Sequence, residues 1–230
     1  AGGPAALETW FHSWKNAERG WQAHLLTKVV AAIRSIEPNH GLLAVPAEPT
    51  LEPTIRTHFT DGEPSSERQL LHRRILDALF ESTRPSANPE IIFTAGAPGS
   101  GKSTVLRILE TRGELDLGSF VRVDADQFHR LLPEYETFRS RAPSEVDRLL
   151  HIEATFIRDL AVNEALARGF SIIREGTFTP AAAHIELVQR IRRENPGYKI
   201  TIVQAVAPLG TILDRARQRS QNDPGQQAQR

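Results

Sequence analysis

The residues best suited to chemistry form one glycine-rich run, Gly96-Ala97-Pro98-Gly99-Ser100-Gly101-Lys102-Ser103, with Thr104 after it. The run fits the pattern G-x-x-x-x-G-K-[ST] and directly follows the apolar stretch that begins at Ile91. Glycines let backbone amides converge on phosphate oxygens, and a helix start adds partial positive charge. We therefore expect residues 96–104 to bind a nucleoside triphosphate, with Lys102 at the β- and γ-phosphates and Ser103 holding Mg²⁺. The loop alone does not separate a kinase from an ATPase, a GTPase or a binding module.

Two carboxylates follow the next apolar run, Phe120–Val123, at what should be the carboxyl end of a strand. Ligands of open parallel sheets bind at that edge. Either Asp124 or Asp126 could accept the proton of an acceptor hydroxyl, and Asp126 is the stronger candidate. If the strand alternation continues, both point to the same side. The alternative for each is a loop aspartate that caps the next segment.

A third set of polar residues, Glu175-Gly176-Thr177, follows the run Ser171–Arg174. Glu175 could contact magnesium or a sugar hydroxyl, and Thr177 a substrate phosphate or hydroxyl, whereas a plain strand-to-helix turn is the alternative. Further along, basic side chains could clamp a phosphate or simply form a solvated helix face; they are Arg215, Arg217 and Arg219. No pair of histidines has convincing metal spacing, and we interpret His129 as a structural or substrate-shell residue.

Short apolar runs alternate with helical segments from residue 90 onward, as is typical of parallel βαβ units. The sequence thus predicts an α/β P-loop NTPase kinase-type fold with a parallel sheet. The expected strands are Ile91–Ala95, Phe120–Val123, Ser171–Arg174 and Lys199–Ala205. The expected helices are Lys102–Thr111, Ser144–Arg168, Ala181–Asn195 and Leu209–Ser220.

The N-terminal part has a different pattern. Apolar residues, including all three tryptophans, recur at helical spacing over Leu7–Ile36, and prolines from Pro38 to Pro64 predict an irregular connection. A second helix is expected over Ser66–Phe80, capped by Ser65 or Ser66. We expect residues 1–60 to form a helical extension and linker, and residues 61–230 the kinase domain. The extension packs on one side of the core, folds back over the nucleotide site, or docks an antitoxin or chaperone.

Composition limits the possible partners. Lys plus Arg and Asp plus Glu both total 28, so the chain has no net positive charge that would attract a nucleic acid polymer. The absence of cysteine excludes thiol chemistry and thiolate metal sites, and no apolar run is long enough to cross a membrane. These features favour a soluble, cytoplasmic protein that acts on a small molecule.

Three segments of the sequence resemble the zeta toxin family of P-loop kinases: residues 95–104, residues 123–128 with Leu132-Pro133, and Glu175-Gly-Thr177. The resemblance implies transfer of phosphate from ATP to a hydroxyl of UDP-N-acetylglucosamine, in a toxin that an antitoxin or chaperone protein binds. It also implies individual roles. Matched positions are the loop lysine Lys102, the general base Asp126, the substrate-side pair Glu175 and Thr177, and the lid arginines Arg219 and Arg230.

Two alternatives stay open at this stage. Related P-loop kinases include effectors that are delivered into host cells and phosphorylate NAD, so the acceptor could be NAD or a free nucleotide. A protein of another class, a nucleotide-gated binding module without transfer activity, would carry the same loop. Arg174 stands where members of the resembled family usually have an apolar residue.

Overall fold

The computed structural model describes residues 51–222. The helix expected at Leu7–Ile36 and the lid candidate Arg230 lie outside them, so the boundary near residue 60 stays a prediction. Contacts within the described chain define two units. One, the helical unit, comprises residues 51–82 and 126–157, and the other, the sheet unit, comprises residues 83–125 and 158–222.

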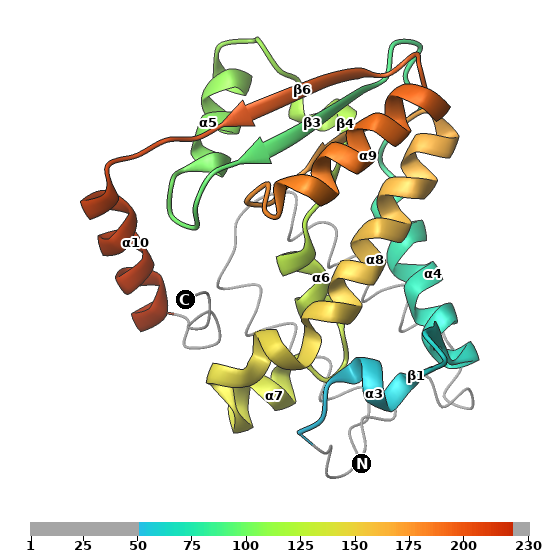
Figure 1. The fold of residues 1–230 in the computed structure, drawn as a ribbon, viewed down its shortest axis with the longest axis vertical. Coiled ribbons are helices and arrows are strands. Elements are labelled where there is room, and N and C mark those ends of the chain that lie inside the picture. The colour runs from blue at the N-terminus through green and yellow to red at the C-terminus, as the bar shows by residue number, and fades with distance from the viewer. Residues whose placement is uncertain (1–50, 223–230) are drawn as a thin grey trace. The chain divides into compact units, whose positions relative to one another are not determined.

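The sheet unit contains four parallel strands in the order β4-β5-β3-β6, and Figure 1 shows β3 and β6 running side by side. Their bounds are β3 (Glu90–Ala95), β4 (Phe120–Val123), β5 (Ser171–Arg174) and β6 (Lys199–Gln204). The central strands β3 and β5 are buried almost throughout, as expected for strands covered on both faces. All four predicted strands and the parallel sheet are thus confirmed, with bounds that differ by at most one residue.

Helices of the sheet unit follow the strands at their carboxyl ends. They are α5 (Lys102–Thr111), α9 (Ala181–Glu194) and α10 (Leu209–Asn222), with a short 3-10 turn, η2 (Leu117–Ser119), before β4. Leu106 of α5 is fully buried against Ile92 of β3 and Ile173 of β5. Burial of each such side chain contributes about 1.5–3 kcal/mol. This contact fixes the start of α5 relative to the strand that precedes the phosphate loop.

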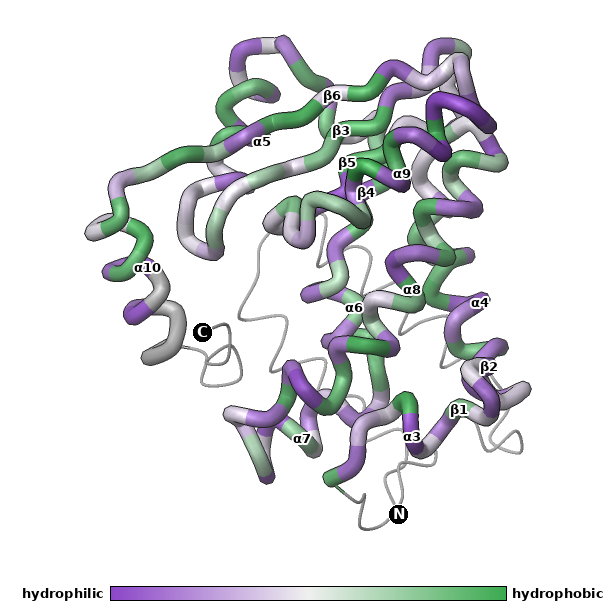
Figure 2. Tube along the Cα trace, viewed as in Figure 1, coloured by the Kyte–Doolittle hydropathy of each residue, from purple (hydrophilic) through white to green (hydrophobic). Residues whose placement is uncertain are grey.

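Helix α8 (Val146–Arg168) starts in the helical unit and ends in the sheet unit. Hydrophobic and hydrophilic residues alternate along it in Figure 2. It ends at Arg168 and is followed by Gly169, whose φ of 71° is left-handed. The amides of Gly169 and Phe170 donate to carbonyls of the last turn. The predicted stop at Gly169 is therefore confirmed, but the predicted start at Ser144 is not, because residues Pro143–Glu145 form a separate 3-10 turn, η3.

The helical unit contains α3 (Thr54–His58), α4 (Ser66–Phe80), α6 (Ala125–Leu131), α7 (Tyr135–Arg141) and the first half of α8. Ser65 caps α4, since its hydroxyl accepts a hydrogen bond from the Arg68 amide. The expected irregular connection was wrong over residues 54–64. These form α3 and a two-strand hairpin, β1 (Phe59–Thr60) and β2 (Glu63–Pro64), whose turn is Asp61-Gly62. Both turn residues have positive φ, which is the Asp-Gly hairpin signal.

A buried charge network ties the elements of the helical unit together. The guanidinium of Arg68 donates to Glu153 through Nε (2.6 Å) and to Glu134 through Nη1 (3.0 Å), with Nη2 contacting both carboxylates. His72 lies 2.7 Å from Glu153, and His58 lies 2.9 Å from Glu134. Burial alone would raise the pKa of Glu153, but its hydrogen bonds to His72 and Arg68 outweigh burial and lower that pKa to about 2.

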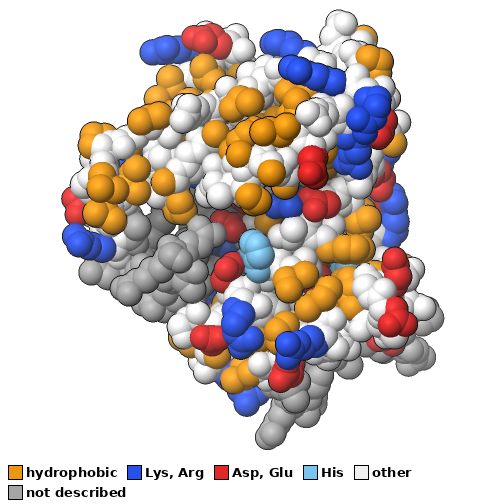
Figure 3. Space-filling view, viewed as in Figure 1, with side chains coloured by type: hydrophobic (Ala, Val, Ile, Leu, Met, Phe, Trp, Pro, Cys, Tyr) orange, Lys and Arg blue, Asp and Glu red, His pale blue; other side chains and the backbone are white. Residues whose placement is uncertain are grey.

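The surface of the sheet unit is apolar in one region. Figure 3 shows hydrophobic side chains gathered over β6 and α10, and the most exposed of them are Ile202, Val206, Leu209 and Leu213. Within residues 51–222, no helix is both long and apolar enough to span a bilayer.

Candidate functional site

The loop after β3 has the backbone that phosphate binding requires. Gly96, Gly99 and Gly101 have φ values of 136°, 83° and 96°, all in the region that favours glycine. A Cβ on Gly96 would lie 2.5 Å from the Ala205 carbonyl oxygen and 2.7 Å from Ser100 Oγ. The close approach between the loop and the end of β6 therefore depends on glycine at position 96.

Several features of this loop suit the binding of an anion. The N-cap of α5 is Gly101, which offers no side-chain cap to the first-turn amides. Ser100 Oγ is buried and has no hydrogen-bond partner among the described residues. Lys102 Nζ donates to the Gly96 carbonyl at 2.8 Å and to the Ala97 carbonyl at 3.2 Å, and these hydrogen bonds fix the ammonium group against the backbone of the loop. These features fit a triphosphate, and the exposed Ser103 at the helix start is placed where it could hold a magnesium ion.

The Glu175-Gly-Thr177 turn is hydrogen-bonded to the same strand and loop. The amide of Gly176 donates to Thr94 Oγ1 (3.0 Å), the Thr94 hydroxyl donates to the Gly176 carbonyl (3.3 Å), and the Gly96 amide donates to the Thr177 carbonyl (3.4 Å). The turn therefore lies against the first residue of the phosphate loop. This contact joins two segments that the sequence separates by about 80 residues.

Glu175 is buried and paired with an arginine of the neighbouring strand. Arg122 of β4 donates through Nε at 2.9 Å and also through Nη2. Sequence reasoning missed this pair, although an arginine within the otherwise apolar run of β4 was a signal. Any ligand that Glu175 contacts must share its carboxylate with Arg122.

Arg174 is buried at the carboxyl end of β5 and pairs with a histidine of α9. His184 Nδ1 lies 3.0 Å from the Pro180 carbonyl, to which it can donate, so His184 Nε2 is free to accept from Arg174 Nη1 at 2.7 Å. Burial, together with the positive charges of Arg174 and Arg158, lowers the pKa of His184. This histidine partner explains how the strand accommodates an arginine at a position where an apolar residue was expected.

Phe178 follows the turn with a left-handed φ of 64°, which costs about 1–3 kcal/mol for a non-glycine residue. Its ring packs against His184 at a tilt of 32°, with centroids 4.3 Å apart, and meets Phe93 edge-on at 5.7 Å. These aromatic contacts offset the strain and fix the exit of the Glu-Gly-Thr turn. Strained backbone of this kind is concentrated at functional sites.

One arginine of α10 contacts the phosphate loop. Arg215 Nη1 donates to the Gly99 carbonyl at 3.2 Å. Arg217 instead pairs with Asp214 on the exposed face of the helix. The backbone of Arg219 lies in α10 but its side chain is outside the described residues, so its lid role stays a prediction. The sequence had grouped these arginines, and the structure adds the specific contact of Arg215.

The two aspartates after β4 do not continue the strand. β4 ends at Val123, and α6 begins at Ala125, so the expected alternation through Asp124 and Asp126 was wrong. Asp124 is half-buried in the connection, and Asp126 is exposed in the first turn of α6, in the helical unit. Buried Phe128 anchors the helix that carries Asp126.

Three features define a nucleotide-binding protein of the P-loop kinase class. They are the parallel sheet, the loop with glycines at positive φ, and the start of α5, which no side chain among the described residues caps. Within that class, the model of the Zeta toxin family matches residues 73–230. The chain belongs to the zeta toxin family, whose kinases are ATP-using phosphotransferases. Among curated proteins, none matches the sequence.

Two solved structures are similar in fold. One belongs to the PezAT chromosomal toxin–antitoxin system of the human pathogen Streptococcus pneumoniae; it is 24% identical, with a TM-score of 0.57, over 72% of this chain and 67% of that chain. The other is a chain of the native AvrRxo1-ORF1:-ORF2 complex, 17% identical with a TM-score of 0.53, over 74% of this chain and 60% of that chain. At these identities the likeness confirms the fold.

Proposed function

We propose that this zeta toxin family kinase transfers the γ-phosphate of ATP to a hydroxyl of a nucleotide-linked sugar, with UDP-N-acetylglucosamine as the first candidate. The observation that carries the proposal is the hydrogen-bonded junction of the phosphate loop with the Glu175-Gly-Thr177 turn. The loop supplies donors for the triphosphate. The turn supplies a carboxylate and a hydroxyl beside it, which are groups that can orient a sugar acceptor.

In the proposed reaction, the acceptor hydroxyl loses its proton to the Asp126 carboxylate as its oxygen bonds to the γ-phosphorus. The bond between that phosphorus and the β–γ bridging oxygen breaks, and ADP leaves. Lys102 and the arginines of α10, Arg215 and Arg219, would offset the charge that develops on the phosphoryl oxygens. Ser103 would hold Mg²⁺, whose charge offsets that of the phosphates. Asp124 and, beyond the described residues, Arg230 are further candidates for acceptor binding.

An acceptor screen tests the substrate class. The purified chain, residues 1–230, is incubated with ATP and one acceptor at a time, which is UDP-N-acetylglucosamine, NAD or a free nucleotide, and mass spectrometry detects the added phosphate. We expect phosphate on the UDP-sugar. Phosphate only on NAD or a nucleotide would replace this acceptor, and no phosphorylated acceptor at all would favour a nucleotide-gated binding module.

The Asp126→Asn variant tests the base. It should bind ATP as the native chain does and lose about 10²–10⁴-fold in transfer rate, because the amide cannot take up the hydroxyl proton. Asp77→Asn is the matched control, since Asp77 is an exposed aspartate of α4 that pairs with Arg73. Native turnover in Asp126→Asn would remove the assignment.

We also propose that an antitoxin protein binds this chain. Support comes from the two similar folds, one of which belongs to a toxin–antitoxin system while the other was crystallised as a two-component complex. Co-expression with candidate antitoxin proteins, followed by size-exclusion chromatography, tests for a stable complex: elution of both proteins in one peak supports the proposal, and separate elution of every candidate contradicts it.

A further inference from the structure

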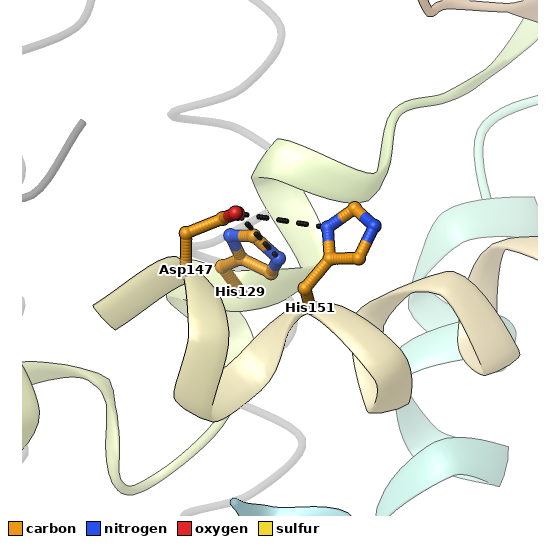
Figure 4. A group of neighbouring side chains, drawn as sticks. All are labelled: His129, Asp147 and His151. Atoms are coloured by element: carbon orange, nitrogen blue, oxygen red, sulfur yellow. Dashed lines mark ion pairs between the residues drawn. The ribbon is translucent and has the colours of Figure 1, made fainter. Parts of the chain in front are cut away.

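Three side chains of the helical unit converge without a role in the proposed reaction. They are His129 of α6 and Asp147 and His151 of α8, and Figure 4 shows them pointing toward one another. Their nearest ligand atoms all lie within 4.8 Å of one another, the one such group found among the described residues. Asp147 Oδ1 lies 3.9 Å from His129 Nε2 and 3.5 Å from His151 Nδ1.

His129 provides a second and independent observation. The residue is only 7% exposed, and its Nε2 atom is buried without a hydrogen-bond partner within the described chain. A buried polar atom that lacks a partner costs about 1–3 kcal/mol, so native proteins rarely retain one without a ligand or water to satisfy it. This nitrogen points toward Asp147 and the ring of His151. The centroids of the His129 and His151 rings are 5.9 Å apart.

We propose that His129, Asp147 and His151 bind a divalent transition-metal ion, with Zn²⁺ as the best match. Two imidazole nitrogens and one carboxylate oxygen suit zinc, whereas Mg²⁺ prefers oxygen ligands alone. Three protein ligands leave a fourth position for water, which can enter because the His151 side chain is 49% exposed. The ligands of this site therefore differ in chemistry from those of the magnesium site proposed at Ser103.

The geometry requires little rearrangement. A tetrahedral zinc ion with bonds of about 2.0–2.1 Å sets its ligand atoms roughly 3.3 Å apart. Asp147 and His151 are one helical turn apart on α8, a spacing that places two ligands on one helix face. Small rotations of exposed His151 and half-buried Asp147 would bring both toward the fixed His129 nitrogen. An ion there would also add positive charge within one turn of Asp126.

The sequence predicted no histidine metal site, because the two histidines are 22 positions apart on different helices. The detectable signal was the pair Asp147 and His151 at i, i+4. The third ligand depends on how α6 packs against α8 within the helical unit, which the sequence pattern does not encode.

Metal titration of the chain, residues 1–230, tests the proposal. The protein is stripped with EDTA, exchanged into chelator-free buffer and titrated with ZnSO₄ by calorimetry, with MgSO₄ in a parallel series. We expect one zinc ion per chain and a rise of Tm with zinc but not with magnesium. His151→Gln and Asp147→Asn should each weaken zinc binding at least about tenfold, since even the loss of an outer-shell partner costs 10–100-fold.

His58→Gln is the matched control. His58 also faces a carboxylate, Glu134, at 2.9 Å, but belongs to no three-ligand group. Zinc affinity should be unchanged in this variant. Because His129→Gln alters a buried position, the test rests on the exposed ligand His151. The proposal is overturned if zinc fails to bind at one per chain, or if His151→Gln binds it as tightly as the native protein.

Discussion

The two units of this protein each contain a buried polar centre, and the two centres use their polar groups in opposite ways. In the helical unit, Arg68 directs its donors onto Glu134 and Glu153, so the charges neutralise one another internally. In the sheet unit, Ser100 Oγ of the phosphate loop has no hydrogen-bond partner within residues 51–222, and no side chain caps the start of α5 there. The first arrangement stabilises a fold, and the second is prepared to bind an anion.

This difference indicates which measurement should respond at each centre. Removal of a charge from a closed network leaves its partners buried and unpaired, which lowers the free energy of unfolding. A substitution in the phosphate loop disrupts fewer internal contacts, so it should lower ligand affinity more than it lowers the free energy of unfolding. Stability and nucleotide affinity can therefore be measured on the same variants to separate a structural centre from a binding centre.

The largest effect is expected for Arg68→Met. It leaves two carboxylates buried without their cation, so the free energy of unfolding should fall by about 3–5 kcal/mol. Urea unfolding followed by circular dichroism measures the loss. Arg73→Met is the matched control, because Arg73 lies on the same helix but pairs with Asp77 at the exposed surface, where such a pair contributes about 0–1 kcal/mol. Equal losses in the two variants would contradict the structural role of the network.

The pH dependence of stability should report the same network. The pKa of Glu153 is lowered from 4.5 to about 2 in the folded chain, and that of Glu134 is lowered as well. Because both folded-state pKa values are depressed, the stabilisation is complete above about pH 4.5 and is lost as the pH falls toward 2. For Glu153 alone the loss should be on the order of 3 kcal/mol.

Urea unfolding at several pH values measures this slope. Glu153→Gln should unfold with a shallower acid dependence than the native chain, since the amide does not titrate. An unchanged slope in that variant would show that other carboxylates govern acid stability.

Contiguity in sequence explains which features could be predicted. The phosphate loop is one uninterrupted run, so its residue types and spacing predict both its glycine conformations and the start of α5. The strands are apolar runs bounded by polar turns, and their parallel direction follows from the βαβ connections. Their order, β4-β5-β3-β6, was not predicted, because β5 lies between the consecutive strands β3 and β4. The Arg68 network joins residues 66 and 85 positions apart. No periodic pattern encodes such pairs, and the Arg122–Glu175 and Arg174–His184 pairs were missed for the same reason.

Gly96→Ala tests the open centre. The added Cβ would meet the Ala205 carbonyl oxygen at 2.5 Å on a backbone that disfavours side chains, so the loop must shift. Strain of about 1–3 kcal/mol corresponds to a loss of about 5- to 150-fold in ATP affinity, measured by calorimetric titration. Gly197→Ala is the control, since a Cβ there meets nothing within 4 Å and φ is not left-handed. ATP affinity equal to that of the native chain in Gly96→Ala would contradict the proposed close approach.

The smallest effect is expected for Arg215→Gln, and it tests whether the open centre is supported by side chains as well as by backbone. Arg215 holds the Gly99 carbonyl through one hydrogen bond at 3.2 Å, worth about 1 kcal/mol, so ATP affinity should fall roughly fivefold. Arg217→Gln, which removes an exposed charge paired with Asp214 on the same helix, should leave affinity unchanged within about twofold. If both variants lose affinity equally, α10 acts on the nucleotide through its overall charge rather than through the Arg215 contact. A loss confined to Arg215→Gln would mean that α10 stabilises the loop directly, and the same titration on Arg219→Gln would then separate loop support from the lid role expected of Arg219.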